Sequence, residues 1–182
     1  MRDFRSETDK VIDLPQVMQY IIGDVLDIGC GVHKITPNAT GVDGRLLPGV
    51  DVVCEHEDIW EKVRAFRKDN NFISVFDTIY SSHFLEHLPD QYGAIKVWEM
   101  MLKRGGHLIL YLPHGDNYDN KENPEHMVDI KYDPFMFWIK RAFCGEGKDF
   151  KGNNLPKVFE LIDSGMDLRP NCYSFFVILR KL

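Results

Sequence analysis

Short apolar runs alternate with amphipathic segments along roughly the first 110 residues of the chain. The apolar runs have the length and composition of strands that are buried on both faces, and they lie at residues 24–30, 40–44, 50–55, 75–82 and 107–113. An amphipathic helix is predicted at 57–70 and another at 90–104, which Asp90 caps and Gly105 and Gly106 end. This alternation predicts a parallel sheet covered by helices.

Two further helical features follow from the same pattern. Residues 11–21 predict an opening helix, or a helix pair that bends near Pro15. The 57–70 helix places its apolar side chains on one stripe and its basic side chains elsewhere, as on a solvated face. The stripe consists of Ile59, Trp60, Val63 and Phe66.

The C-terminal part of the chain has a different pattern. Residues 157–166 and 174–181 are two strand-like runs with no room between them for a crossover helix, so we expect them to pair antiparallel. The long segment 113–152 before them contains an aromatic helix at 132–143. We interpret 113–152 as a lid that binds the acceptor. Of its aromatic residues Phe135, Phe137, Trp138 and Phe143, two or three are expected to pack in the core.

Composition limits the class of protein. With 182 residues, 44% hydrophobic, the chain 1–182 suits one globular domain. Its net charge of −6 disfavours a nucleic-acid partner. The N-terminal residues are too charged for a secretory leader, and no apolar run reaches the roughly 20 residues of a membrane span. We therefore expect a cytoplasmic protein with reduced cysteines and no membrane partner; none of these features sets an oligomeric state.

A glycine turn follows the first predicted strand in the sequence VLDIGCGVHK, residues 25–34. Gly29 and Gly31 allow a ligand to approach the backbone closely. A dinucleotide site would need a third glycine where Lys34 stands, and a phosphate-facing helix that Pro37 leaves little room for. The turn therefore favours a nucleoside ligand without a pyrophosphate over NAD, although NAD stays an alternative.

Four stretches in order, VLDIGCG, GVDGRLLPGVDVVCE, FDTIYSSHFLEHLPD and KRGGHLILYLPH, resemble the class I S-adenosylmethionine-dependent methyltransferases, in particular the compact type 11 group. The resemblance covers nearly the whole chain. It implies an α/β fold, a Rossmann-like three-layer sandwich with a seven-stranded, mostly parallel sheet and an antiparallel C-terminal strand. It also implies S-adenosylmethionine as the cofactor. His33 departs from the family pattern, because it stands where the last glycine of the turn is usual.

The cofactor site expected from the residues and the resemblance lies along the ends of the first four strands. Asp43 would bind the ribose hydroxyls, and the acidic and aromatic side chains after the third strand would lie beside adenine. For Asp58, capping of the next helix is an equal alternative. The expected cofactor-binding residues are Asp27, Gly29, Cys30, Gly31, Asp43, Gly44, Glu55, His56, Asp58, Ser81 and Ser82.

The expected reaction is methyl transfer to an oxygen or nitrogen of an acceptor, with positioning as the main catalytic device. His83, His114 and His126 are the candidate catalytic residues, because a histidine can take up a proton near neutral pH. The stretch after the fourth strand lacks the DPPY-like run and the Pro-Cys pair of base-methylating enzymes. A small metabolite or a sugar intermediate is therefore the favoured acceptor.

Two other functions remain open. His83, Glu86 and His87 match the H-x-x-E-H motif of inverted zinc peptidases, but the helical frame before Pro89 is short and no third ligand is evident. In the methyltransferase interpretation, which predicts no metal site, Glu86 and His87 instead brace the loop. The second alternative, suggested by His33 and the shortened first helix, is a non-catalytic S-adenosylmethionine-binding protein.

Overall fold

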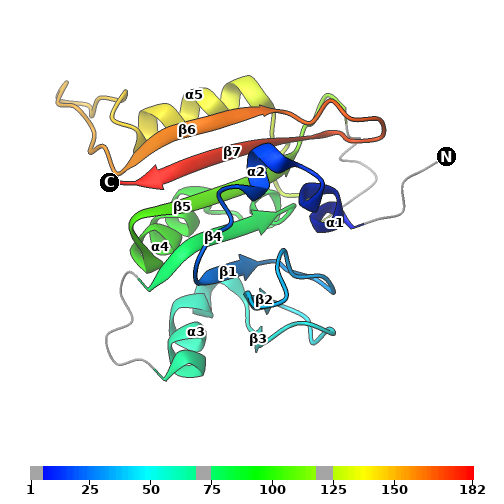
Figure 1. Cartoon of the computed structure of the whole chain (residues 1–182). Coiled ribbons are helices and arrows are strands. Elements are labelled where there is room, and N and C mark those ends of the chain that lie inside the picture. Colours follow the sequence, from blue (N-terminus) through cyan, green and yellow to red (C-terminus); the bar gives the residue numbers. More distant parts are fainter. Residues whose placement is uncertain (1–5, 69–74, 118–124) are drawn as a thin grey trace.

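A single seven-stranded sheet forms the centre of the computed structural model, which describes residues 6–68, 75–117 and 125–182 (Figure 1). The strand order is β3-β2-β1-β4-β5-β7-β6. The strands are β1 (Val25–Ile28), β2 (Thr40–Asp43), β3 (Val52–Val53), β4 (Phe76–Ser82), β5 (Leu102–Pro113), β6 (Phe159–Met166) and β7 (Ser174–Lys181).

The sheet is parallel from β3 to β5, and β7 is antiparallel to both β5 and β6. The predicted strands and the antiparallel C-terminal pair are therefore confirmed. Because β7 runs against β5, its first residue Ser174 pairs with the last residue of β5, Pro113. The start of β7 thus lies at the same edge of the sheet as the carboxyl ends of the parallel strands.

Helices cover both faces of the sheet, as the three-layer prediction requires (Figure 1). The larger core lies between the sheet and three helices, and a smaller core lies under two short N-terminal helices. The helices of the larger core are α3 (Ile59–Arg67), α4 (Gln91–Met101) and α5 (Tyr132–Phe143). The short ones are α1 (Glu7–Ile12) and α2 (Pro15–Met18), and two 3₁₀ turns are η1 (His56–Asp58) and η2 (Leu85–His87).

The prediction that Gly105 and Gly106 end the 90–104 helix is wrong. Helix α4 is capped by the Asp90 side chain, as expected, but it ends at Met101, and β5 begins at the next residue. The two glycines lie inside β5, where the register against β4 shifts. A Cβ at Gly106 would lie 2.8 Å from the carbonyl oxygen of Asp77. The glycines therefore mark an irregular part of a strand: Gly106 has no room for a side chain, and Gly105 has a positive φ of 78° that favours glycine.

Other local predictions have mixed outcomes. The predicted break of the N-terminal helix pair near Pro15 is confirmed, but the first helix begins at Glu7, before the predicted range, and the second ends at Met18. The prediction that Phe66 belongs to the buried apolar stripe is wrong, because 49% of its surface is exposed. Helix α5 forms where the aromatic helix was predicted; Phe135 and Phe143 are buried in the larger core, whereas Phe137 is 65% exposed. Among the described residues, no helix is long and apolar enough to cross a membrane.

The buried position of Leu110 in β5 leads to a prediction about the stability of the protein. Leu110 is fully buried in the larger core, so Leu110→Ala should lower the free energy of unfolding by about 2–5 kcal/mol. Leu46→Ala is the matched control, since Leu46 is 84% exposed and its loss should change this energy by less than about 0.5 kcal/mol. Urea denaturation followed by circular dichroism measures both; equal effects would contradict the assignment of the core.

Candidate functional site

The glycine turn between β1 and β2 is tied to the end of β2. Gly29 and Gly31 have positive φ angles of 74° and 57°, which favour glycine. The Gly31 amide donates a hydrogen bond of 3.0 Å to Oδ2 of Asp43, and the Arg45 amide donates one of 2.9 Å to Oδ1. Nε of Arg45 donates a third, longer hydrogen bond of 3.3 Å to Oδ1. A carboxylate has about four acceptor positions, so Asp43 retains about one for a hydroxyl of a ligand.

Asp27 and Cys30 contact the residues that form the glycine turn and its surroundings. Asp27 is buried, and its Oδ2 accepts a hydrogen bond of 2.6 Å from the Ile35 amide at the far end of the turn. Burial raises the pKa of Asp27 to about 7. The Cys30 thiol is packed so closely under Gly41 that a Cβ there would lie 2.9 Å from its sulfur, and burial raises its pKa to about 12. Asp27 and Cys30 therefore contact other residues of the protein around the turn.

The segment after β3 brings together the residues expected beside adenine. A Cβ at Gly44 would lie 3.7 Å from Oε1 of Glu55, so the two residues adjoin. The His56 ring packs edge-on against Trp98, with ring centroids 5.8 Å apart. Asp58 occupies the N-cap position of α3, but its side chain makes no capping hydrogen bond. Asp58 therefore has the expected capping position but not the capping hydrogen bond.

His83 leaves the end of β4 with a positive φ of 49°, after the buried Ser81 and Ser82. Its Nε2 lies 2.8 Å from the Ser174 hydroxyl at the start of β7 and 3.5 Å from Oε2 of Glu7 in α1. Burial lowers the pKa of His83 to about 3, so the ring is neutral near pH 7 and a weak base.

Glu86 and His87 hold the segment that follows the fifth strand. The Glu86 carbonyl accepts hydrogen bonds from the amides of Met127 and Val128, and Nδ1 of His87 donates one of 3.0 Å to the Glu125 carbonyl. The backbone of Glu86 and the side chain of His87 thus hold residues 125–128 against the loop that follows β4. They also bring His126 to Glu86, with 3.8 Å between His126 Nε2 and Glu86 Oε1.

In the described structure, the residues of the zinc-peptidase motif do not lie on one α-helix. Leu85–His87 form only one 3₁₀ turn, and His83 precedes that turn with a left-handed backbone. The two histidines of the motif therefore do not lie one turn apart on an α-helix, as that chemistry requires.

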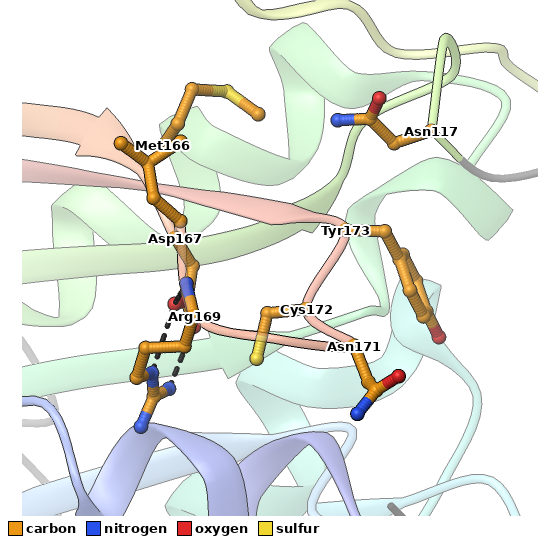
Figure 2. Close-up of a pocket in the computed structure, with 8 residues that line it drawn as sticks. Asn117, Met166, Asp167, Arg169, Asn171, Cys172 and Tyr173 are labelled. Carbon is orange, nitrogen blue, oxygen red and sulfur yellow. Dashed lines mark hydrogen bonds and ion pairs between the residues drawn. The ribbon is translucent and has the colours of Figure 1, made fainter. Parts of the chain in front are cut away.

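A cavity of about 420 Å³ lies at the connection between β6 and β7, on the same edge of the sheet (Figure 2). Asp167 and Arg169 form an ion pair in its wall. Burial acts to raise the pKa of Asp167, but hydrogen bonds from Arg169 and Tyr111 outweigh it and hold the pKa at about 2. Tyr173, another lining residue, contacts the His83 ring edge-on at 5.6 Å between centroids, which connects the cavity to the end of β4.

His114 lies beside this region at the end of β5. Its backbone amide donates a hydrogen bond of 2.8 Å to the Tyr173 carbonyl. Its Nδ1 accepts one of 3.2 Å from the Asp116 amide. His83 and His114 thus both contact the segment that leads into β7.

Comparison with known proteins decides the family. The profile of a family described as methyltransferase domain matches residues 8–138, well over half of the chain. The chain belongs to this methyltransferase family. The sequence-based prediction of a class I methyltransferase is confirmed, and the methyl donor of that class is S-adenosylmethionine. No curated protein sequence is similar enough to the chain to count as a match.

Solved structures show the same fold at low sequence identity. An S-adenosylmethionine-dependent methyltransferase from Archaeoglobus fulgidus has a TM-score of 0.58 at 15% identity, over 98% of this chain and 96% of that one. An N-methyltransferase from Bradyrhizobium japonicum has 0.55 at 13%, over 96% and 93%. Magnesium protoporphyrin IX methyltransferase from Synechocystis, solved with bound S-adenosylmethionine, has 0.53 at 14%, over 96% and 78%.

Some residues of this site were not found from the sequence. Glu7, Tyr173 and Ser174 surround His83, yet they lie far from it along the chain. The grouping of His126 with Glu86 was also missed, although the H-x-x-E-H spacing had marked Glu86 as chemically unusual. A single sequence gives no signal for these contacts, because they depend on how the ends of distant strands meet in the fold.

The buried Asp27 predicts a pH dependence of stability. Its folded pKa of about 7 exceeds the unfolded value of about 3.9, so the folded chain binds the proton more tightly and loses stability as the pH rises from about 4 to 7. Asp27→Asn keeps an acceptor for the Ile35 amide but has no charge to bury. We expect the loss of stability between pH 5 and pH 8, measured by urea denaturation, to be smaller in this variant of the methyltransferase.

Asp77→Asn is the control for this measurement. The pKa of Asp77 is lowered, chiefly by its hydrogen bond with the Asp24 amide, so Asp77 is ionised at both pH values. Its replacement should leave the difference between pH 5 and pH 8 unchanged. An unchanged difference in Asp27→Asn as well would contradict the prediction.

Proposed function

We propose that this methyltransferase transfers the methyl group of S-adenosylmethionine to an oxygen or nitrogen of a small acceptor, a metabolite or a sugar intermediate. The observation that carries the proposal is the hydrogen bond between the Gly31 amide and Asp43, which joins the glycine turn to the acid at the end of β2. A carboxylate at this edge of a parallel sheet suits the ribose hydroxyls of a nucleoside.

The cofactor would lie across the ends of β1 to β4. In this proposal Gly29 and Gly31 face its methionine part, Asp43 its ribose, and Glu55 or Asp58 its adenine amino group. His56 would line the ring, and Ser81 and Ser82 would lie near the sulfonium. Asp27 and Cys30 would act indirectly, because their contacts hold the shape of the turn.

The reaction needs little from the protein beyond alignment. The acceptor atom attacks the methyl carbon, the bond from carbon to sulfur breaks, and S-adenosylhomocysteine leaves as the neutral thioether. The acceptor loses a proton to solvent or to a nearby base. His83, His114 and His126 remain the candidate residues around the acceptor; the low pKa of His83 supports a role in positioning more than in proton uptake.

Several observations support a small acceptor. The cavity beside Tyr173 is of a size that suits a metabolite, and the Asp167–Arg169 ion pair holds the shape of its wall. The net charge of −6 disfavours nucleic acid. The segment from 113 to 152 is kept as the proposed acceptor-binding lid; its residues 118–124 lie outside the described part of the chain, and its helix α5 packs on the sheet. All four cysteines are free, which supports a cytoplasmic location.

Asp43 gives the direct test of the cofactor site. Asp43→Asn removes the charge that strengthens hydrogen bonds from the ribose, and should weaken binding of S-adenosylmethionine by about tenfold to a hundredfold in isothermal titration calorimetry. The matched control is Asp51→Asn, because Asp51 also accepts a backbone hydrogen bond, from the Gly41 amide at 2.8 Å, but lies outside the proposed site. Unchanged affinity in Asp43→Asn would contradict the proposal.

Turnover separates the enzyme from a protein that only binds the cofactor, the alternative that His33 and the shortened first helix suggested. With S-adenosylmethionine and a panel of small hydroxyl and amine compounds, we expect S-adenosylhomocysteine to form faster than without protein. Chromatography of the reaction mixtures measures it. Tight cofactor binding with no product on any acceptor would favour the non-catalytic alternative.

A further inference from the structure

Glu86 has an unusual environment for a carboxylate. Its side chain is fully buried, and neither of its oxygens has a hydrogen-bond partner among the residues that the structure describes. Burying an unpaired carboxylate is strongly unfavourable, and buried polar groups are almost always satisfied. The proposed methyl transfer assigns no role to this carboxylate, so its position calls for another explanation.

Three histidine nitrogens lie around one oxygen of Glu86. Nδ1 of His83, Nε2 of His87 and Nε2 of His126 lie 3.8, 3.9 and 3.8 Å from Oε1. These distances are too long for hydrogen bonds, so the nitrogens do not satisfy the carboxylate. The ligand atoms of Glu86, His87 and His126 all lie within 4.8 Å of one another. We call these three residues the Glu86 cluster.

The hydrogen bond of His87 sets the tautomer of its ring, and so decides which nitrogen has a free lone pair. A carbonyl oxygen only accepts, so Nδ1 of His87 carries the proton that bonds the Glu125 carbonyl at 3.0 Å. In the neutral ring Nε2 is then unprotonated and points toward Glu86. A metal-binding histidine is held in this way, with its other nitrogen donating to a carbonyl or carboxylate.

We propose that the Glu86 cluster binds one divalent first-row transition-metal ion, such as Zn²⁺ or Mn²⁺. Two imidazoles and one carboxylate form a ligand set that such ions prefer. A tetrahedral ion with bonds of about 2.0–2.1 Å holds its ligand atoms about 3.4 Å apart, so closure needs side-chain shifts of roughly an ångström or less. Glu86 and His87 come from the loop after β4, and His126, the third ligand, comes from the segment after β5.

Three protein ligands leave one coordination position open for water or another oxygen. The loop that carries Glu86 packs against the glycine turn, because a Cβ at Gly29 would lie 2.8 Å from Phe84, two residues before Glu86. If this position takes an acceptor hydroxyl, the ion lowers the hydroxyl pKa and replaces a strong protein base. This last step rests on the proposed function, whereas the metal site does not.

The test is metal binding to the whole chain, prepared without a histidine tag and stripped with a chelator. Titration with Mn²⁺ and separately with Zn²⁺ should show one equivalent bound, and Co²⁺ should give the visible absorption of nitrogen and oxygen ligands without thiolate bands. Mn²⁺ is included because it binds thiolates poorly, and the chain has four free cysteines.

Glu86→Gln and His126→Ala should each weaken Mn²⁺ binding by about a hundredfold or more, and circular dichroism checks that both variants fold. His107→Asn is the matched control, since His107 lies on β5 outside the cluster and should leave binding unchanged. Absence of binding at one equivalent, or equal binding in all three variants, would overturn the proposal.

The outcome is independent of methyl transfer. Binding of S-adenosylmethionine is measured on the same samples without added metal. Metal binding that fails while cofactor binding persists would overturn only the metal site. Metal binding lost in the Glu86→Gln variant, together with an absence of cofactor binding in the native chain, would support the metal site and overturn the proposed function.

Discussion

The parallel register of β1 with its two neighbours is the constraint on which the candidate site depends. Ile28, the last residue of β1, pairs with Val42 of β2 and with Ser81 of β4. The residues that follow these positions therefore leave the sheet side by side, and the glycine turn meets Asp43 and the β4 loop at one edge. The hydrogen bond between Gly31 and Asp43 is possible only in this register, because a shift of one residue would turn the Asp43 side chain to the other face.

Burial at this edge gives its charged groups unusual properties. Asp27 and Glu86 are both fully or almost fully removed from water, and burial raises the pKa of each, to about 7 and about 8. Their environments differ, however. Asp27 accepts a backbone hydrogen bond and holds the turn, whereas Glu86 has histidine nitrogens around it at distances that leave room for an ion. The first is a structural carboxylate, and the second carries the metal proposal.

The N-terminal helix and the start of β7 complete the edge from the other side. Glu7 and Ser174 both reach His83, and the Tyr173 hydroxyl donates a hydrogen bond of 3.2 Å to Glu7. Antiparallel pairing brings the beginning of β7 here, while the ends of the parallel strands arrive from the opposite direction. The surroundings of His83 thus form from chain segments more than a hundred residues apart.

The sequence by itself determined the order and type of nearly all the elements, the antiparallel C-terminal pair and the turn with Gly29, Gly31 and Asp43. Periodicity and strand spacing are local properties, so they can be read from one chain. It did not determine that β5 starts at Leu102, because glycine ends a helix or marks a strand irregularity according to what packs against it. Only the tertiary structure brought His126 to Glu86, since this outcome depends on a contact between distant segments.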